Sequence, residues 1–217
     1  MPDAAPESAA AESAAAARAR AVRARHAASL LVLRFHAGEP EMLMGMRGSR
    51  HRFMPNRLVF PGGAVDKADL KAPCASGLAP HTERLLRKNA PPALAHGIGA
   101  AAARELLEET GLSLGSPAHL EGLEFLCRAV TPPTNPIRFN ARFLVVSAER
   151  VSGTIGGDGE LDNLRYYPME EAMALDLAIP TRRVLERLRT WLTLSEEERL
   201  AQTQTAVLKR DRGWVME

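Results

Sequence analysis

The stretch RELLEETGL, residues 104–112, is the most informative segment of this sequence. It ends a longer run, residues 97–112, whose alanines and leucines predict a helix with one apolar side that packs on a sheet. At about 100° of rotation per residue, that side includes Ala100, Ala103, Leu106 and Leu107. Gly111 occupies the position of a left-handed residue that ends a helix, and Leu107 and Leu112 form the hydrophobic pair expected across such a stop.

Three glutamates of this segment, Glu105, Glu108 and Glu109, are spaced i, i+3 and i+4, so we expect them together on the opposite side of the helix. Each like-charged pair costs about 0.2–0.5 kcal/mol, and the helix dipole disfavours each charge there by about 0.3–1 kcal/mol. Arg104 offsets part of this cost by pairing with Glu108. A hard divalent cation would reverse the balance, because such ions prefer carboxylate oxygens. The alternative is a solvated acidic face without function.

Composition places the chain among ordinary globular proteins. Hydrophobic residues make up 46% of the 217 residues and charged residues 25%, with a net charge of +2, so we expect neither a nucleic-acid partner nor a membrane partner. Cys74 and Cys127 lie far apart and form no CxxC pair, which disfavours a zinc site or a disulfide framework and favours a cytoplasmic protein.

The order of predicted elements indicates one domain, residues 25–217, behind a flexible Ala- and Arg-rich tail, residues 1–24. The prolines between residues 70 and 96 indicate a surface excursion that holds one short helix. Strands mixed with helices suggest a sheet with helices on its faces, and the oligomeric state, including a homodimer, is left open. The other predicted elements are strands at 27–35, 41–47, 58–60, 123–130, 137–148 and 164–169 and closing helices at 169–176 and 180–192.

Residues 104–112 match the second half of the Nudix box, REUxEExGU with U aliphatic, and the chain thereby resembles the Nudix hydrolase superfamily. The first half, Gx5E, begins at Gly63 but carries Asp69 in place of its glutamate. Residues 97–103 supply the usual seven-residue spacer, and residues 70–96 are then an insertion inside the box. The resemblance implies an α/β/α sandwich with a mixed β-sheet and a hydrolase that cleaves a diphosphate linkage.

Two further stretches are similar to the coenzyme A diphosphatase branch of this superfamily. These are VFPGGAVDKADL before the insertion and AVTPPTNPIRFNARF after the predicted helix. This resemblance implies coenzyme A or acyl-coenzyme A as substrate, a nucleotide-like small molecule. Two alternatives stay open, namely a Nudix hydrolase of ADP-ribose, dinucleotide cofactors or modified nucleoside triphosphates, and a non-catalytic Nudix sensor that only binds nucleotides.

The resemblance also implies roles for the acidic residues. Glu105, Glu108 and Glu109 would bind Mg²⁺ or Mn²⁺, and Arg104 would hold the glutamates in place. The proton of the attacking water would pass to Glu105 or to a loop carboxylate, for which we select Glu160 at the end of a Gly-rich stretch. The intact glutamates argue against a module that only binds.

Substrate contacts are predicted from residue type. Glycines lack side chains and let a loop run close to a diphosphate, and arginine forks match phosphate oxygens. The predicted substrate-binding residues are Gly62, Gly63, Arg47, Arg52, Arg138 and Arg142. Arg50, which lies with Arg52 in the polar stretch of residues 48–57, is a further candidate.

Overall fold

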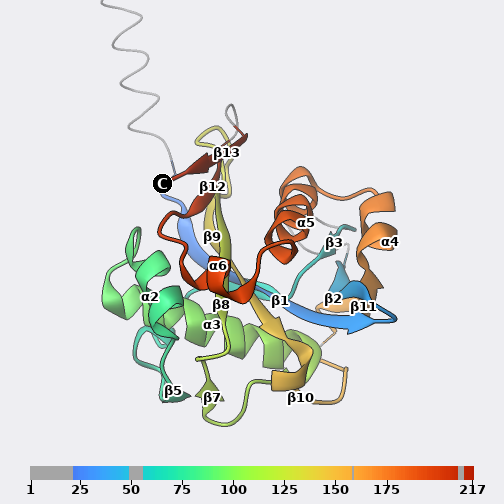
Figure 1. Cartoon of the computed structure of the whole chain (residues 1–217), viewed down its shortest axis with the longest axis horizontal. Coiled ribbons are helices and arrows are strands. Elements are labelled where there is room, and N and C mark those ends of the chain that lie inside the picture. Colours follow the sequence, from blue (N-terminus) through green and yellow to red (C-terminus); the bar gives the residue numbers. More distant parts are fainter. Residues whose placement is uncertain (1–21, 49–55, 158, 210–212) are drawn as a thin grey trace, which may run out of the picture.

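The computed structural model describes residues 22–48, 56–157, 159–209 and 213–217 (Figure 1). Of the predicted tail, only residues 22–24 fall in this range. The helices are α2 (Pro80–Arg87), α3 (Pro92–Thr110), α4 (Met169–Ala174), α5 (Ile179–Leu192) and α6 (Glu196–Leu200), with 3-10 turns η1 (Asp69–Lys71) and η2 (Ala148–Arg150). The strands are β1 (Arg25–His36), β2 (Glu39–Arg47), β3 (Leu58–Val59), β4 (Gly62–Ala64), β5 (Cys74–Ser76), β6 (Leu112–Ser113), β7 (Ala118–His119), β8 (Glu124–Val130), β9 (Phe139–Ser147), β10 (Ser152–Gly153), β11 (Leu161–Pro168), β12 (Ala206–Lys209) and β13 (Gly213–Met216).

Within the described residues, nine strands form one mixed sheet with the order β11-β2-β1-β9-β8-β12-β13, while β3 pairs with β2 and β4 with β1. The β1–β9 pair is parallel from Arg25↔Phe139 to Leu33↔Ser147, and β12 runs parallel to β8. The other pairs in this sheet are antiparallel. The predicted mixed sheet is confirmed.

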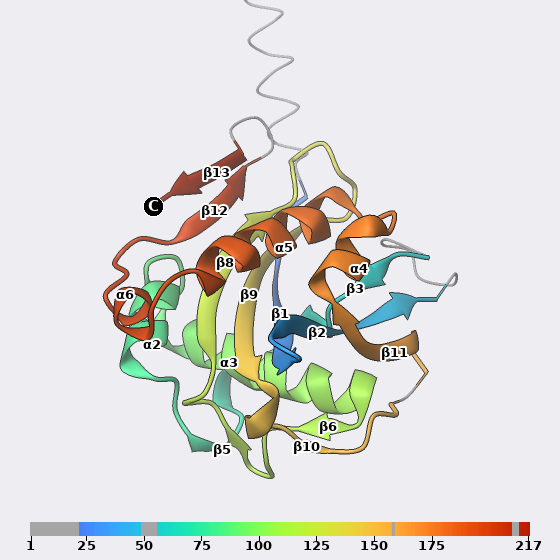
Figure 2. The ribbon, with the colours of Figure 1, turned by 45° about the vertical axis from the view of Figure 1, so that its right-hand side comes forward.

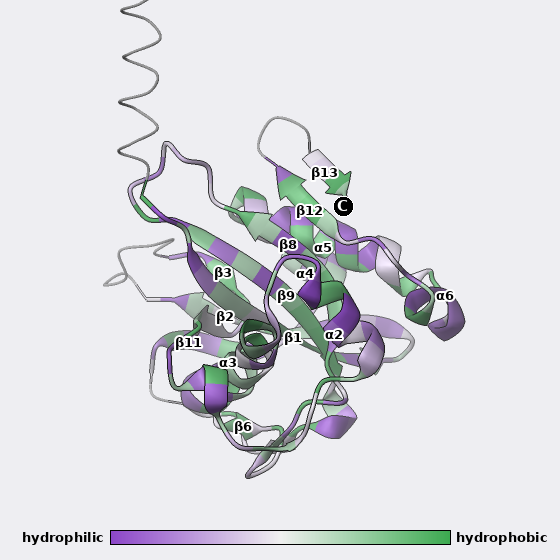
Figure 3. Ribbon diagram, turned by 90° about the vertical axis from the view of Figure 1, so that its left-hand side faces the viewer, coloured by the Kyte–Doolittle hydropathy of each residue, from purple (hydrophilic) through white to green (hydrophobic). Residues whose placement is uncertain are grey.

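Helices cover both faces of the sheet. The side chains of each strand alternate between these two faces, so a single strand contributes to both cores. In β1, Leu30 and Val32 join a core with α2 and α3, whereas Leu31 and Leu33 join a second core with α4 and α5. Figure 2 shows α3 and α5 on opposite sides of the central strands, and Figure 3 shows the hydrophobic stretches of these strands between the helices. The layers are those of the predicted α/β/α sandwich.

Helix α3 is longer than predicted and differently rotated. It starts at Pro92, where the fixed φ of proline suits the first helical position. Its stop is confirmed, since Gly111 is left-handed at φ 71° and donates its N–H to Leu107 O over 2.9 Å. The prediction of a hydrophobic pair between Leu107 and Leu112 across that stop is wrong. Leu107 is 53% exposed, and the N–H of Leu112 donates to the hydroxyl of Thr110.

The segment 70–96 is not a surface excursion. Leu85 and Leu86 of α2 are buried in the same core as α3, and Thr82 donates its hydroxyl to Leu123 O over 2.7 Å. The leucines of this segment therefore contribute to the first core, although its prolines were read as loop markers.

The C-terminal strands were not predicted. Beyond the expected helix, β12 and β13 pair in antiparallel register from Ala206↔Met216 to Lys209↔Gly213 and extend the sheet beyond β8. Among the residues that the structure describes, no helix is long and apolar enough to cross a membrane.

Candidate active site

Gly62 and Gly63, the first two residues of β4, lie against the last turns of α3, and we call this pair the glycine turn. Gly62 donates its N–H to Glu109 Oε2 over 2.8 Å, and a Cβ on Gly63 would lie 2.2 Å from Glu105 Oε1. The φ of Gly62 is 150°, a conformation that side chains rarely adopt, and a Cβ there would lie 2.3 Å from Ala28 O. The two glycines thus allow the backbone to approach the helix closely.

Glu109 is buried rather than displayed on a solvated acidic face. Only 2% of this residue is exposed, and burial together with the charges of Glu105 and Glu160 raises the pKa of its carboxyl to about 8, against the opposing Gly62 N–H and Arg47. Burial likewise raises the pKa of Glu105, against the opposing charge of Arg104. Two crowded carboxylates therefore lie at the glycine turn without full compensation.

Arg104 organises the acidic residues as predicted. Its Nη1 donates to Glu105 Oε1 over 2.8 Å and to Glu108 Oε2 over 2.9 Å. Its other edge binds Asp69, with Nε 3.1 Å from Oδ1 and Nη2 3.1 Å from Oδ2, and Nη2 also donates to Ala64 O. The hydrogen bond with Asp69 is the main reason that the pKa of Arg104 is raised well above its ordinary value.

Asp69 has a structural contact that the sequence did not reveal. The residue is 3% exposed, and in addition to binding Arg104 it accepts the N–H of Asp66 over 2.8 Å. Since both of its oxygens are engaged by this chain, Asp69 fixes the arginine that in turn fixes Glu105. Asp69, whose side chain is shorter than that of the glutamate in the Nudix pattern, therefore still orients Arg104.

Glu160 and Arg47 complete the acidic cluster. Nη2 of Arg47 lies 3.5 Å from Glu160 Oε1 and 3.7 Å from Glu109 Oε1. Glu160 also acts electrostatically on Glu105 and Glu109, because its charge raises the pKa of both carboxyls. The loop carboxylate selected from the sequence thus lies close to the helix glutamates.

A Gly-rich loop brings Glu160 to this position by packing on the end of α3. Gly156 donates its N–H to Thr110 O over 2.8 Å. A Cβ on Gly157, whose φ is 122°, would lie 2.2 Å from Glu109 O. The glycine-rich composition of residues 152–160 was a visible signal, but its contact with α3 was not part of the prediction.

Two other predicted arginines, Arg138 and Arg142, make their contacts elsewhere. Arg52, with Arg50, lies outside the described residues. Arg142 is 1% exposed, and its guanidinium contacts His26 Nδ1, Asn140 O and Asn89 O at 2.8–3.0 Å. Arg142 is therefore a buried structural residue, and its prediction as a phosphate ligand is corrected.

Arg138 also differs from its prediction. It lies where β1 and β9 begin, with Nε 3.1 Å from Thr131 O and Nη1 2.5 Å from Val22 O. These backbone contacts hold the loop between β8 and β9 in place. They give no support to a contact between Arg138 and a substrate phosphate.

The oxygen donors of the cluster fit a divalent cation in part. In the described part of the chain, no three His, Cys, Asp or Glu side chains are gathered as a ready metal-binding group. Glu108 in particular has a 51% exposed side chain and pairs with Arg104. Glu105 and Glu109, however, are oxygen donors one helical turn apart at the glycine turn. Arg47 and Arg104 offset their repulsion with each other and with Glu160 only in part, since the pKa of both carboxyls is raised, and this suits a hard cation.

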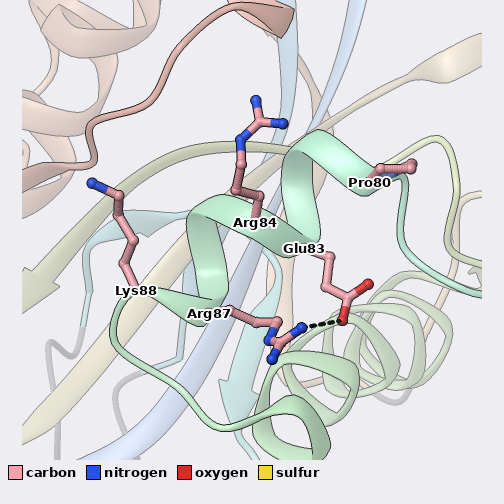
Figure 4. Close-up of a pocket in the computed structure, with 5 residues that line it drawn as sticks. All are labelled: Pro80, Glu83, Arg84, Arg87 and Lys88. Carbon is pink, nitrogen blue, oxygen red and sulfur yellow. Dashed lines mark ion pairs between the residues drawn. The ribbon is translucent and has the colours of Figure 1, made fainter.

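Two surface hollows of the described residues lie away from this site. One lies on α2 and is lined by Pro80, Glu83, Arg84, Arg87 and Lys88, with an Arg87–Glu83 ion pair at 3.8 Å (Figure 4). Another lies over α6. Neither is lined by the acidic cluster, so the chemistry of the side chains identifies the site better than surface shape does.

Comparison with known proteins agrees with this geometry. Residues 96–188 match the family model described as NUDIX domain. This match covers less than half of the 217 residues. The match begins at residue 96, within α3, and includes the three glutamates of that helix and the Gly-rich loop that leads to Glu160. No curated protein matches the chain by sequence.

Solved structures show the same fold. A NUDIX hydrolase from Alicyclobacillus acidocaldarius is 24% identical with a TM-score of 0.61, over 76% of this chain and 90% of that one. The NUDIX domain of Shewanella oneidensis NrtR, solved with ADP ribose, is 14% identical with a TM-score of 0.52, over 79% and 90%. A MutT NUDIX hydrolase from Burkholderia pseudomallei is 20% identical with a TM-score of 0.50, over 77% and 99%. These likenesses show that the chain shares the fold of these three structures.

Proposed function

We propose that this chain is a Mg²⁺- or Mn²⁺-dependent hydrolase that cleaves a diphosphate linkage in a nucleotide-like small molecule. One observation carries the proposal. Glu109 accepts the N–H of Gly62 and Glu105 lies against Gly63, while Arg47 lies within 3.7 Å of both Glu109 and Glu160. Carboxylates for a cation and a guanidinium for phosphate are parts that diphosphate hydrolysis needs.

The bound cation would supply charge neutralisation for the diphosphate and a more acidic water. Glu105 and Glu109 would hold it, with Glu108 as the third carboxylate of the set. Asp69 orients Arg104, and Arg104 orients Glu105. These contacts help to fix the position of the Glu105 carboxylate. Glu105 or Glu160 would accept the proton of the attacking water.

Coenzyme A or acyl-coenzyme A is the substrate we propose first, on the basis of the stretches VFPGGAVDKADL and AVTPPTNPIRFNARF. ADP-ribose is the second candidate, favoured by the fold shared with the NrtR domain solved with ADP ribose. We further propose a tail at residues 1–24, a single domain at 25–217 with residues 70–96 inserted, and a cytoplasmic location consistent with two free cysteines.

A substrate panel tests the proposal. The protein is incubated with Mg²⁺ or Mn²⁺ and with coenzyme A, an acyl-coenzyme A, ADP-ribose, a dinucleotide cofactor or a modified nucleoside triphosphate, and products are identified by mass. Cleavage of coenzyme A should give phosphopantetheine and an adenosine bisphosphate. Cleavage of ADP-ribose should give AMP and ribose phosphate. A folded protein that binds these compounds but cleaves none would instead be a nucleotide sensor.

A further inference from the structure

The backbone of Arg47 is fixed at the rim of the acidic cluster. Arg47 ends β2, where its N–H donates to Arg57 O over 2.9 Å and its carbonyl accepts the N–H of Asn56 over 2.8 Å. On the neighbouring strand it is in register with Leu161, the residue that follows Glu160. Its side chain is 18% exposed and is thus largely enclosed. The guanidinium therefore belongs to the site and is not a freely moving surface group.

The contacts of this guanidinium are unusual. Nη2 lies between two carboxylates, 3.5 Å from Glu160 and 3.7 Å from Glu109, which are distances of ion pairs and not of short hydrogen bonds. Nε of Arg47 is buried and has no hydrogen-bond partner among the residues that the structure describes. A buried N–H without an acceptor is unfavourable, so the fork of Arg47 is only partly used by the chain itself.

We propose that Arg47 is the counter-ion of the cation-free site, which a divalent cation displaces, and that the displaced guanidinium then turns its Nε–Nη2 edge to a substrate phosphate. This inference rests on the proposed function. A guanidinium and a dication are attracted to the same carboxylates and repel each other at such short range. A phosphate oxygen would also provide the acceptor that Nε lacks, because the arginine fork matches phosphate geometry.

The proposal makes metal affinity and substrate affinity change in opposite directions. In Arg47→Gln the competing charge is lost, so the dissociation constant for Mg²⁺ should fall by about tenfold, while KM for the diphosphate substrate rises. Arg47→Lys keeps the charge but not the fork. In that variant Mg²⁺ affinity should stay close to that of the unsubstituted protein, and only KM should rise.

Isothermal titration with Mg²⁺ in the absence of substrate tests this. It is carried out at pH 8.5, above the raised pKa of Glu109, so that protons compete less for the carboxylate. The matched control is Arg189→Gln, which removes the same charge from a 59% exposed side chain on α5, on the other side of the sheet. This control should change neither constant.

The outcomes are distinguishable. Tighter Mg²⁺ binding by Arg47→Gln together with a raised KM supports the role of Arg47. Equal or weaker Mg²⁺ binding by Arg47→Gln, with normal binding by the unsubstituted protein, overturns that role and leaves the proposed function intact. Absence of Mg²⁺ binding by the unsubstituted protein contradicts the proposed function itself. If Arg47→Gln does not fold, an unchanged KM in Arg47→Lys is sufficient to overturn the inference.

Discussion

Gly62 donates its backbone N–H to Oε2 of Glu109 over 2.8 Å, and this bond ties the glycine turn to the last turn of α3. It is the one hydrogen bond from the turn that directly holds a carboxylate of the described cluster. Glu109 is 2% exposed and is the most enclosed of the three helix glutamates. Burial is also the largest cause of the raised pKa of its carboxyl.

Glu109→Gln should reduce turnover by on the order of a hundredfold or more, because a neutral amide is a poorer partner for the cation and for the charge that develops during reaction. Without metal, the melting temperature should be unchanged or raised, since repulsion from Glu105 and Glu160 is relieved. Kinetics and thermal unfolding in EDTA measure both effects. Glu170→Gln, at an exposed carboxylate of α4, is the control. A marked loss of metal-free stability in Glu109→Gln would disagree with this account.

The metal-free protein should lose stability as pH rises. The pKa of Glu109 is raised to about 8 from an ordinary 4.5, so folding favours the protonated carboxyl. The resulting stabilisation is complete below pH 4.5 and disappears as pH rises through 8. Urea unfolding in EDTA between pH 5.5 and 9 measures it. Mg²⁺ should oppose the decline at high pH, and a curve for Glu109→Gln as steep as that of the unsubstituted protein would refute the assignment.

Gly63→Ala should lower kcat with little effect on stability. The added Cβ would lie 2.2 Å from Glu105 Oε1, at the end of a flexible side chain that can move aside, but moving it misplaces the carboxylate. A displacement of about 1 Å can cost roughly a hundredfold in rate. Gly77→Ala is the matched control, because a Cβ there meets nothing within 4 Å. Equal activity of the two variants would argue against a role for Glu105 in the reaction.

Gly157→Ala should impair both stability and catalysis. The new Cβ would lie 2.2 Å from Glu109 O, and backbone cannot yield as a side chain does, so the loop that carries Glu160 must shift. Gly38→Ala is the control, since Gly38 also has a positive φ, 84°, but open space around its Cβ position. Gly38→Ala should cost about 1–2 kcal/mol of folding free energy and leave kcat unchanged. If both variants keep full kcat, Glu160 has no part in the reaction.

Local patterns predicted α3, its glycine stop and the set of acidic residues, because these depend on spacing along one helix. The rotation of the helix was less well predicted. At about 100° per residue, Glu109 lies only about 60° from Leu106 around the axis, whereas Leu107 lies about 100° away. The buried face is centred near Leu106, so Glu109 is enclosed and Leu107 is exposed.

Long-range contacts explain what sequence patterns missed. The Asp69–Arg104 pair joins residues 35 positions apart, and the burial of Arg142 depends on Asn89 and His26 from other elements. Pro91 and Pro92 were interpreted as loop residues, although Pro92 begins α3. None of these contacts produces a periodic signal along the chain, so only the folded arrangement reveals them.

The central claim is that crowded carboxylates at the glycine turn hold a divalent cation. Crystals grown with Mn²⁺ and measured by anomalous diffraction test it most directly. The account predicts an anomalous peak between the carboxylates of Glu105 and Glu109, beside Gly62 and Gly63. Well-ordered carboxylates that stay apart with no peak between them, at millimolar Mn²⁺, would contradict it.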